Sequence, residues 1–165
     1  MYPSSGVDSV VAVSTHTRYH ILMKKKIMII EDDKGLQDIY TINFESAGYE
    51  VLIEEDGLSG ISEVVEKKPD IILLDVMMPN MDGFAFLKAM NQNMSINVPV
   101  VICSNLSDKE TYDKAFAAGA AAVLLKVNYS GKELVQKIDL LLSESKSKHK
   151  EKAPEPTTDT QETVA

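Results

Sequence analysis

Short apolar runs recur through the middle of the chain, and amphipathic stretches separate them. The runs span residues 26–30, 50–53, 70–74, 98–103 and 121–125. Because apolar side chains occupy both alternating faces of these runs, each one is typical of a strand covered on both sides. Strands that alternate with helices form a parallel sheet, so the pattern predicts an α/β domain with a doubly wound sheet of five strands.

The stretches between the runs carry apolar residues at a spacing near 3.6, which predicts helices. The first stretch carries Leu36, Ile39 and Tyr40 and ends at Gly48, a residue type that favours helix termination. Two later helices are predicted to begin at capping boxes, in which a serine stands three residues before a glutamate. These are Ser107 with Glu110, and Ser130 with Glu133. Helical spacing also predicts that Phe116 packs into the core.

The two ends of the chain differ from its middle. The apolar core of residues 1–23 is only Val10-Val11-Ala12-Val13, too short for a spanning helix, and Asp8 stands where a signal peptide carries positive charge. We interpret residues 1–23 as a disordered extension, or as the product of a start codon upstream of Met23. Residues 144–165 mix Lys and Glu with Pro and Thr and predict a disordered polar tail. The predicted domain is therefore 24–143.

Composition narrows the possible functions. The 165 residues suit one domain, and the net charge of −8 argues against a nucleic-acid surface, which needs clustered Lys and Arg. The single cysteine, Cys103, excludes an internal disulfide and fits a reducing cytoplasm. His16, His20 and His149 lie near the ends, so the centre lacks the imidazole that a Ser-His triad or a His-ligated metal requires.

Polar residues with complementary chemistry follow four of the predicted strands. Glu31 and Asp32 follow the first, Asp75 the third, Ser104 the fourth and Lys126 the fifth. In doubly wound folds the carboxyl ends of the strands form the ligand site, so these side chains are expected to converge. Clustered carboxylates favour a divalent cation such as Mg²⁺, and an ammonium and a hydroxyl can bind phosphoryl oxygens. The set predicts phosphoryl transfer onto Asp75.

The segments IMIIEDD, IILLDVMMPNMDG, VPVVICS and AAVLLK, in this order and spacing, resemble the receiver domain of two-component response regulators. The resemblance covers about residues 25–142, and DVMMPNMDG is its most specific segment. It implies a flavodoxin-like sheet of strand order 2-1-3-4-5, with Asp75 as phosphoacceptor, Ser104 as switch hydroxyl and Lys126 as the lysine. It also implies that Asp32, Asp75 and the backbone carbonyl of Met77 bind Mg²⁺, with Glu31 acting through water. Asp33 is expected to cap the first helix instead.

The chain departs from the family pattern at three positions. Val127 stands where the family has a proline after a cis bond, so we expect a trans bond here, because a cis bond before a non-proline residue is costly. Val123 stands where the family often has a switching aromatic residue, which removes that switch. Asn105 replaces a smaller residue and is expected to narrow access for the phosphodonor.

Two apolar residues suggest slow loss of phosphate. In receivers, the residues two beyond the phosphoacceptor and two beyond the switch hydroxyl flank the approach of water to the acyl phosphate. Here these are Met77 and Leu106, neither of which can orient a water molecule. We therefore expect the phosphoryl group to persist longer than in rapid chemotaxis-type receivers.

Three hypotheses of function remain open at this point. The first is a stand-alone, cytoplasmic receiver that a sensor histidine kinase or a histidine phosphotransfer protein phosphorylates, and that catalyses only its own phosphorylation and dephosphorylation. It would signal to an unidentified downstream protein without binding nucleic acid or membrane, as a monomer, with dimerisation on phosphorylation left open. The second is a receiver-like interaction module that no longer cycles phosphate. The third is an aspartate-nucleophile phosphohydrolase, although Met77 stands where such enzymes carry a second acid.

Overall fold

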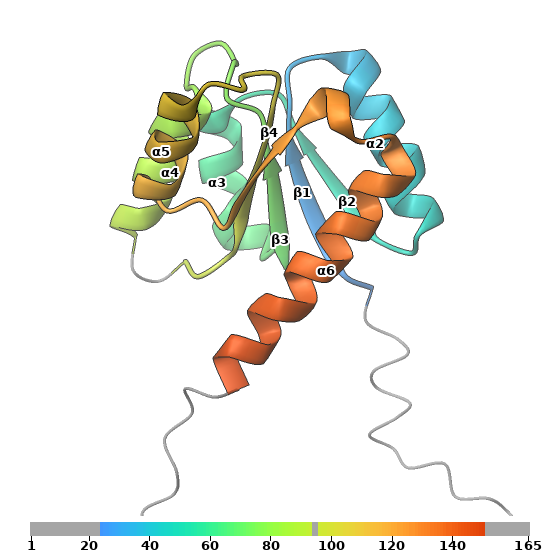
Figure 1. Ribbon diagram of the computed structural model, residues 1–165. Coiled ribbons are helices and arrows are strands. Elements are labelled where there is room, and N and C mark those ends of the chain that lie inside the picture. The colour runs from blue at the N-terminus through green and yellow to red at the C-terminus, as the bar shows by residue number, and fades with distance from the viewer. Residues whose placement is uncertain (1–23, 94–95, 151–165) are drawn as a thin grey trace, which may run out of the picture.

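The computed structural model describes residues 24–93 and 96–150, in which five parallel strands form one sheet (Figure 1). The strands are β1 (Lys26–Ile30), β2 (Glu50–Glu54), β3 (Ile71–Leu74), β4 (Val100–Ser104) and β5 (Ala122–Leu125). Their order is β2-β1-β3-β4-β5, and every neighbouring pair is parallel. The predicted flavodoxin-like fold is confirmed.

Helices cover both faces of the sheet. They are α2 (Lys34–Ser46), α3 (Gly57–Lys67), α4 (Gly83–Gln92), α5 (Lys109–Ala117) and α6 (Gly131–Lys150), with a short 3₁₀ helix, η1 (Lys126–Asn128), after β5. Figure 1 shows α2 and α6 on one side of the sheet and α3, α4 and α5 on the other. Each crossover therefore returns the chain to the same edge, as parallel strands require.

The strands are apolar on both faces because each face meets its own layer of helices. In β1, Ile27 and Ile29 belong to the core shared with α2 and α6, whereas Met28 and Ile30 belong to the core shared with α3 and α4. This alternation follows from the period of two in a strand. The sheet is thus buried on both sides, and only its edges are left to form a site.

Aspartates begin four of the helices. Asp33, Asp56, Asp82 and Asp108 are the N-cap residues of α2, α3, α4 and α5, and each side chain accepts a hydrogen bond from a backbone N–H of the first turn. The expected role of Asp33 is confirmed. The prediction that Ser107 caps its helix is wrong, because the next residue, Asp108, accepts from Thr111 N at 2.8 Å.

The second predicted capping box is present. Ser130 Oγ accepts from the backbone N–H of Glu133, and the Glu133 carboxylate accepts from the backbone N–H of Ser130 at 2.8 Å. Gly48 ends the first helix as expected, with φ of 89°, a left-handed conformation that glycine adopts without strain.

The apolar faces of two helices differ from the sequence prediction. Phe116 is 53% exposed rather than buried, because α5 turns Thr111 and Ala115 to the core instead. These two small residues lie one turn apart and leave room for α5 to lie close to the sheet. Ile39 in α2 is also exposed, because Gln37, Tyr40 and Phe44 form the buried face of that helix.

The last helix continues past the predicted domain boundary at residue 143. α6 extends to Lys150, and residues 144–150 include no proline or glycine that would stop a helix. The predicted extension, residues 1–23, and the part of the predicted tail (144–165) from residue 151 on lie outside the described residues. Within the described part of the chain, no helix combines the length and the apolar composition needed to cross a bilayer.

Candidate functional site

Three carboxylates meet at the carboxyl ends of β1 and β3. Glu31, Asp32 and Asp75 each offer an oxygen, and these atoms all lie within 4.8 Å of one another. Glu31 and Asp75 are buried, whereas Asp32 is exposed. β1 and β3 are hydrogen-bonded neighbours in register, with Ile30 beside Leu74, so the residues that follow these two strands are brought together by the sheet itself.

Lys126 reaches this cluster from the far edge of the sheet. Its Nζ donates to Glu31 Oε2 at 2.6 Å and lies 3.0 Å from Asp75 Oδ2. The three side chains are almost fully enclosed, with exposures of 10% for Lys126, 3% for Glu31 and 7% for Asp75. The arrangement is a buried lysine shared between two carboxylates.

The loop after Lys126 places this lysine without a cis bond. The described residues contain no cis peptide, so the bond between Lys126 and Val127 is trans. Lys126 begins η1, and the backbone N–H of Tyr129 donates a hydrogen bond to the carbonyl oxygen of Lys126. The replacement of the family proline by Val127 therefore leaves the lysine in contact with both acids.

Burial sets the charge state of the pocket. It raises the pKa of Glu31 above its ordinary value, although the hydrogen bond and the charge of Lys126 act in the opposite direction. Burial alone would lower the pKa of Lys126, but its hydrogen bonds to Glu31 and Asp75 outweigh that effect and the pKa is raised. Lys126 stays protonated, and its single charge faces more than one carboxylate.

The loop that follows β3 keeps Asp75 close to the start of α4. Asp75 Oδ1 accepts from the backbone N–H of Val76 at 2.7 Å, and Gly83 N donates to Val76 O at 3.1 Å. A Cβ on Gly83 would meet the carbonyl oxygen of Asp75 and would lie 2.9 Å from Val76 Cα. The glycine of the DVMMPNMDG segment is thus required by close contact with the backbone of Asp75.

Ser104 ends β4 and is 1% exposed. Its Oγ accepts a hydrogen bond from the backbone N–H of Leu106 at 3.2 Å, which fixes the turn after the strand. Asn105, the residue between them, is exposed. The hydroxyl therefore lies at the same sheet edge as the acids, where the sequence predicted it.

A hollow that begins at the residue after Asp75 is lined by the two residues predicted to control water access. Met77 and Leu106 line it together with Val76, Phe84 and Lys114. Met77 is 66% exposed and Leu106 is half-buried. The Lys114 ammonium lies 4.1 Å from the centre of the Phe84 ring, a cation–π contact that joins α4 and α5.

Gln37 is a residue of this region that the sequence analysis missed. It is buried in α2, and its Nε2 donates to the carbonyl oxygen of Glu31 at 2.5 Å. Its position was visible as a polar residue three before Tyr40 and seven before Phe44, which places it on the buried face of the helix.

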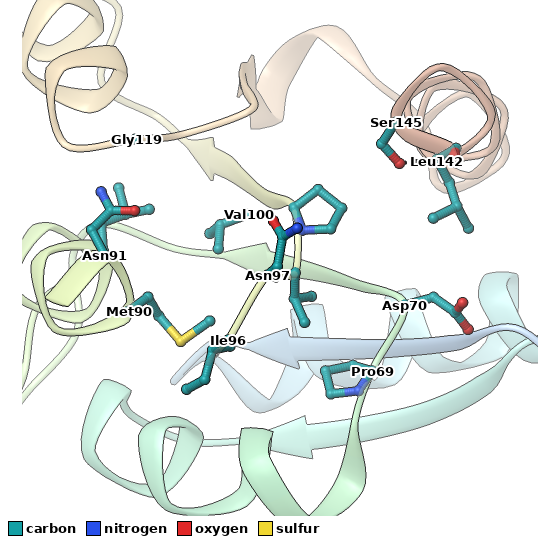
Figure 2. A pocket seen from close by; sticks show the side chains of 13 residues that line it. Pro69, Asp70, Met90, Asn91, Ile96, Asn97, Val100, Gly119, Leu142 and Ser145 are labelled. Atoms are coloured by element: carbon teal, nitrogen blue, oxygen red, sulfur yellow. Dashed lines mark hydrogen bonds between the residues drawn. The ribbon is translucent and has the colours of Figure 1, made fainter. Parts of the chain in front are cut away.

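A separate hollow opens at the opposite edge of the sheet, at the amino ends of β3 and β4 (Figure 2). Asp70 is the one carboxylate among its described lining residues, and it accepts from the backbone N–H of Lys26 at 2.9 Å. No lysine or arginine is among those residues. This hollow does not combine acids with an ammonium, so the candidate site is the one at the carboxyl edge.

Comparison with known proteins agrees with this geometry. The family model described as response regulator receiver domain matches residues 27–139, which includes the acids, Ser104 and Lys126. The chain belongs to this family. Receiver domains act as phosphoacceptor switches in two-component signalling and are phosphorylated by histidine kinases.

Curated relatives are longer than this chain. The DNA-binding dual master transcriptional regulator RpaA of Synechocystis is 32% identical over 118 residues, covering 71% of this chain and 48% of RpaA. The response regulator ArlR of Staphylococcus saprophyticus is 37% identical over 89 residues, which cover 54% of this chain and 39% of ArlR. The match to this chain thus spans about half the length of RpaA and less than half the length of ArlR.

Solved receiver structures superpose over most of the domain. The receiver domain of the Francisella response regulator 1452 has a TM-score of 0.68 at 28% identity, covering 74% of this chain and 99% of that one. A CheY-like receiver domain protein from Methanospirillum hungatei has a TM-score of 0.70 at 24% identity, covering 76% of this chain and 99% of that one. At this identity the likeness shows the fold alone.

Proposed function

We propose that this receiver accepts a phosphoryl group on Asp75. The observation that carries the proposal is the contact of the Lys126 ammonium with Asp75 Oδ2, at 3.0 Å, inside a pocket that Glu31 and Asp32 complete. The carboxylate of Asp75 is the candidate nucleophile, because it lies at a strand end next to a positive charge that can bind an incoming phosphoryl group.

The donor set fits a magnesium ion. Three carboxylates with oxygens within 4.8 Å repel one another, and one ammonium only partly compensates their charge. In the proposal Asp32, Asp75 and the carbonyl of Met77 hold Mg²⁺, with Glu31 acting through water. When bound, the ion neutralises charge on the phosphoryl oxygens.

The bonds that form and break in the transfer step belong to the chain and its donor. An oxygen of Asp75 forms a bond to phosphorus as the bond from phosphorus to the donor's histidine nitrogen breaks, and the imidazole leaves with that electron pair. The Lys126 ammonium moves from the two carboxylates to a phosphoryl oxygen, and the Ser104 hydroxyl donates to another. These two contacts, which form only when a phosphoryl group is present, are the proposed switch.

The proposed donor is a sensor histidine kinase or a histidine phosphotransfer protein, and the proposed output is binding to a downstream protein. RpaA and other relatives are named as DNA-binding regulators, and about half of RpaA lies outside the match. A stand-alone, cytoplasmic domain that binds no nucleic acid directly stays a prediction, as does the monomeric state.

Mass spectrometry of the intact protein tests the proposal. Incubation with Mg²⁺ and acetyl phosphate should add one phosphoryl group, about 80 Da, to the wild type and to Asp38→Asn, a control on the exposed surface of α2. Asp75→Asn should add none. An adduct that persists in Asp75→Asn refutes the assignment. No adduct on the wild type, from acetyl phosphate or from a histidine kinase, favours the interaction module that no longer cycles phosphate.

We also propose that the phosphoryl group is long-lived. Met77 and Leu106 line one hollow, which begins at the residue after Asp75, and neither side chain can hold a water molecule in position for attack. The double variant Met77→Asn with Leu106→Glu should lose the phosphoryl adduct, of about 80 Da, faster than the wild type does. Equal rates in the double variant and the wild type would rule this out.

A further inference from the structure

Gln37 is hydrogen-bonded to the chain on both sides of Asp32. Its side-chain Nε2 donates to the carbonyl oxygen of Glu31 at 2.5 Å, and its own backbone N–H donates to the carbonyl oxygen of Asp33 at 2.9 Å. One residue of α2 thus holds the carbonyls that precede and follow Asp32. The residue is 6% exposed, so its amide is bonded inside the protein rather than to bulk water.

The side chain of Asp32 is not held by contacts of its own. Among residues 24–93 and 96–150, no hydrogen bond or ion pair to its carboxylate is found, and the residue is exposed. Glu31 differs, because Lys126 bonds its carboxylate and Glu54 O accepts from its backbone N–H at 3.0 Å. The backbone of residues 31–33 therefore sets where the Asp32 side chain begins, and with it the region that its carboxylate can reach.

The sequence uses an amide where an apolar residue would be usual. Gln37 shares the buried face of α2 with Tyr40 and Phe44, a face that packs on the sheet. Burying an amide costs free energy unless it is hydrogen-bonded, so its bond to Glu31 explains why the residue is tolerated there. If this position only packed against the sheet, leucine or methionine would fill it equally well.

We propose that Gln37 is a positioning residue, which fixes the Glu31–Asp33 loop so that the Asp32 carboxylate faces Asp75 for binding a divalent cation. This proposal rests on the proposed function, because it assumes that the acids bind such an ion. Groups that orient metal ligands without touching the metal typically change affinity by 10–100-fold when removed. Loss of the Gln37 amide should act in the same way.

The test is metal binding by the full, unphosphorylated chain. Gln37→Met keeps the volume of the side chain but removes the N–H donor, and Gln37→His keeps a neutral donor at the same number of bonds from the backbone. Titration calorimetry with Mg²⁺, and electron paramagnetic resonance with Mn²⁺, should show affinity at least about tenfold weaker in Gln37→Met and partly restored in Gln37→His.

A matched control lies on the same helix. Asn43 also donates from its side-chain amide to a backbone carbonyl, that of Ile39, but this bond is remote from the acids. Asn43→Ala should leave the Mg²⁺ affinity unchanged. Urea unfolding in EDTA on each variant separates a loss of metal affinity from a loss of folding. If Gln37→Met does not fold, Gln37→Asn, whose amide is too short to reach Glu31, replaces it.

The outcomes separate this inference from the proposed function. Wild-type affinity in Gln37→Met, or in the folded Gln37→Asn, overturns the role of Gln37 and leaves the phosphoacceptor proposal standing. Equal weakening in Asn43→Ala also overturns it, since any change in α2 would then have the same effect. A wild type that binds neither Mg²⁺ nor Mn²⁺ overturns both proposals.

Discussion

Removing the ammonium of Lys126 tests whether the charged groups of the pocket behave as a buried cluster. Lys126→Met keeps a side chain of similar length but loses the contacts of Nζ with Glu31 at 2.6 Å and Asp75 at 3.0 Å. Removing one partner of a buried ion pair costs roughly 3–5 kcal/mol, whereas an exposed pair is worth about 0–1 kcal/mol. Because the exposed Asp32 opens the pocket to water, we expect a loss of about 3 kcal/mol.

Urea unfolding followed by circular dichroism measures this loss. EDTA is present so that no divalent cation replaces the missing charge. A domain of this size unfolds with a free energy of about 5–15 kcal/mol, so the expected change is readily resolved. The double variant Glu31→Gln with Lys126→Met should recover part of the loss, because it removes one of the two carboxylates that the single variant leaves without a counter-charge.

The loss should also depend on pH, with a defined sign. The pKa of Glu31 is already raised by burial and rises further without Lys126. A carboxyl with a raised pKa in the folded state stabilises the fold at low pH and loses that contribution as the pH rises through the raised pKa. Lys126→Met should therefore be less destabilised at about pH 5 than at about pH 8. A loss below about 1 kcal/mol that does not change with pH would refute the buried-cluster reasoning.

Three further predictions concern the scaffold. Gly83→Ala should destabilise the protein by about 1–3 kcal/mol in thermal unfolding, because its Cβ would meet the backbone of Asp75, whereas the exposed Gly35→Ala, whose Cβ would meet only the Asp33 side chain at 3.1 Å, should cost less; equal effects would contradict the close contact. Burial raises the pKa of the Cys103 thiol to about 11, so iodoacetamide at about pH 8 should alkylate it only in urea, and rapid labelling of the folded protein would show the thiol to be accessible. Ser130→Ala should cost about 1 kcal/mol through loss of the capping box, which an unchanged urea midpoint would disprove.

The parts of the fold that the sequence predicted are those that a strong local pattern encodes. Uniformly apolar runs identify strands buried on both faces, and a polar residue directly after each run then falls at the site edge. Asp75 and Lys126 were found in this way although they are far apart in the chain. Their contact at 3.0 Å follows from the parallel sheet and needed no knowledge of side-chain packing.

The parts that the sequence did not predict depend on competition between neighbouring residues. Ser107 and Asp108 can both cap a helix, and the structure uses Asp108, whose carboxylate accepts from both the backbone N–H and the hydroxyl of Thr111. Phe116 fits a helical stripe by spacing, but α5 packs through the smaller Thr111 and Ala115. The spacing of Gln37 from Tyr40 and Phe44 places it on the buried face, but its polarity argues for solvent, and only the carbonyl of Glu31 makes its burial favourable.

Carboxylate caps on four successive helices shape the electric field at the mouth of the pocket. Because α2, α3, α4 and α5 all begin at the strand-end edge, Asp33, Asp56, Asp82 and Asp108 place negative charge there, around Glu31, Asp32 and Asp75. Such a rim concentrates divalent cations and repels small anions, over a range of about 8 Å at physiological ionic strength. A small, anionic phosphodonor approaches against this potential. Under the proposed function, a protein donor can meet the rim with basic residues, and the helix caps would then favour such a donor over a small anion.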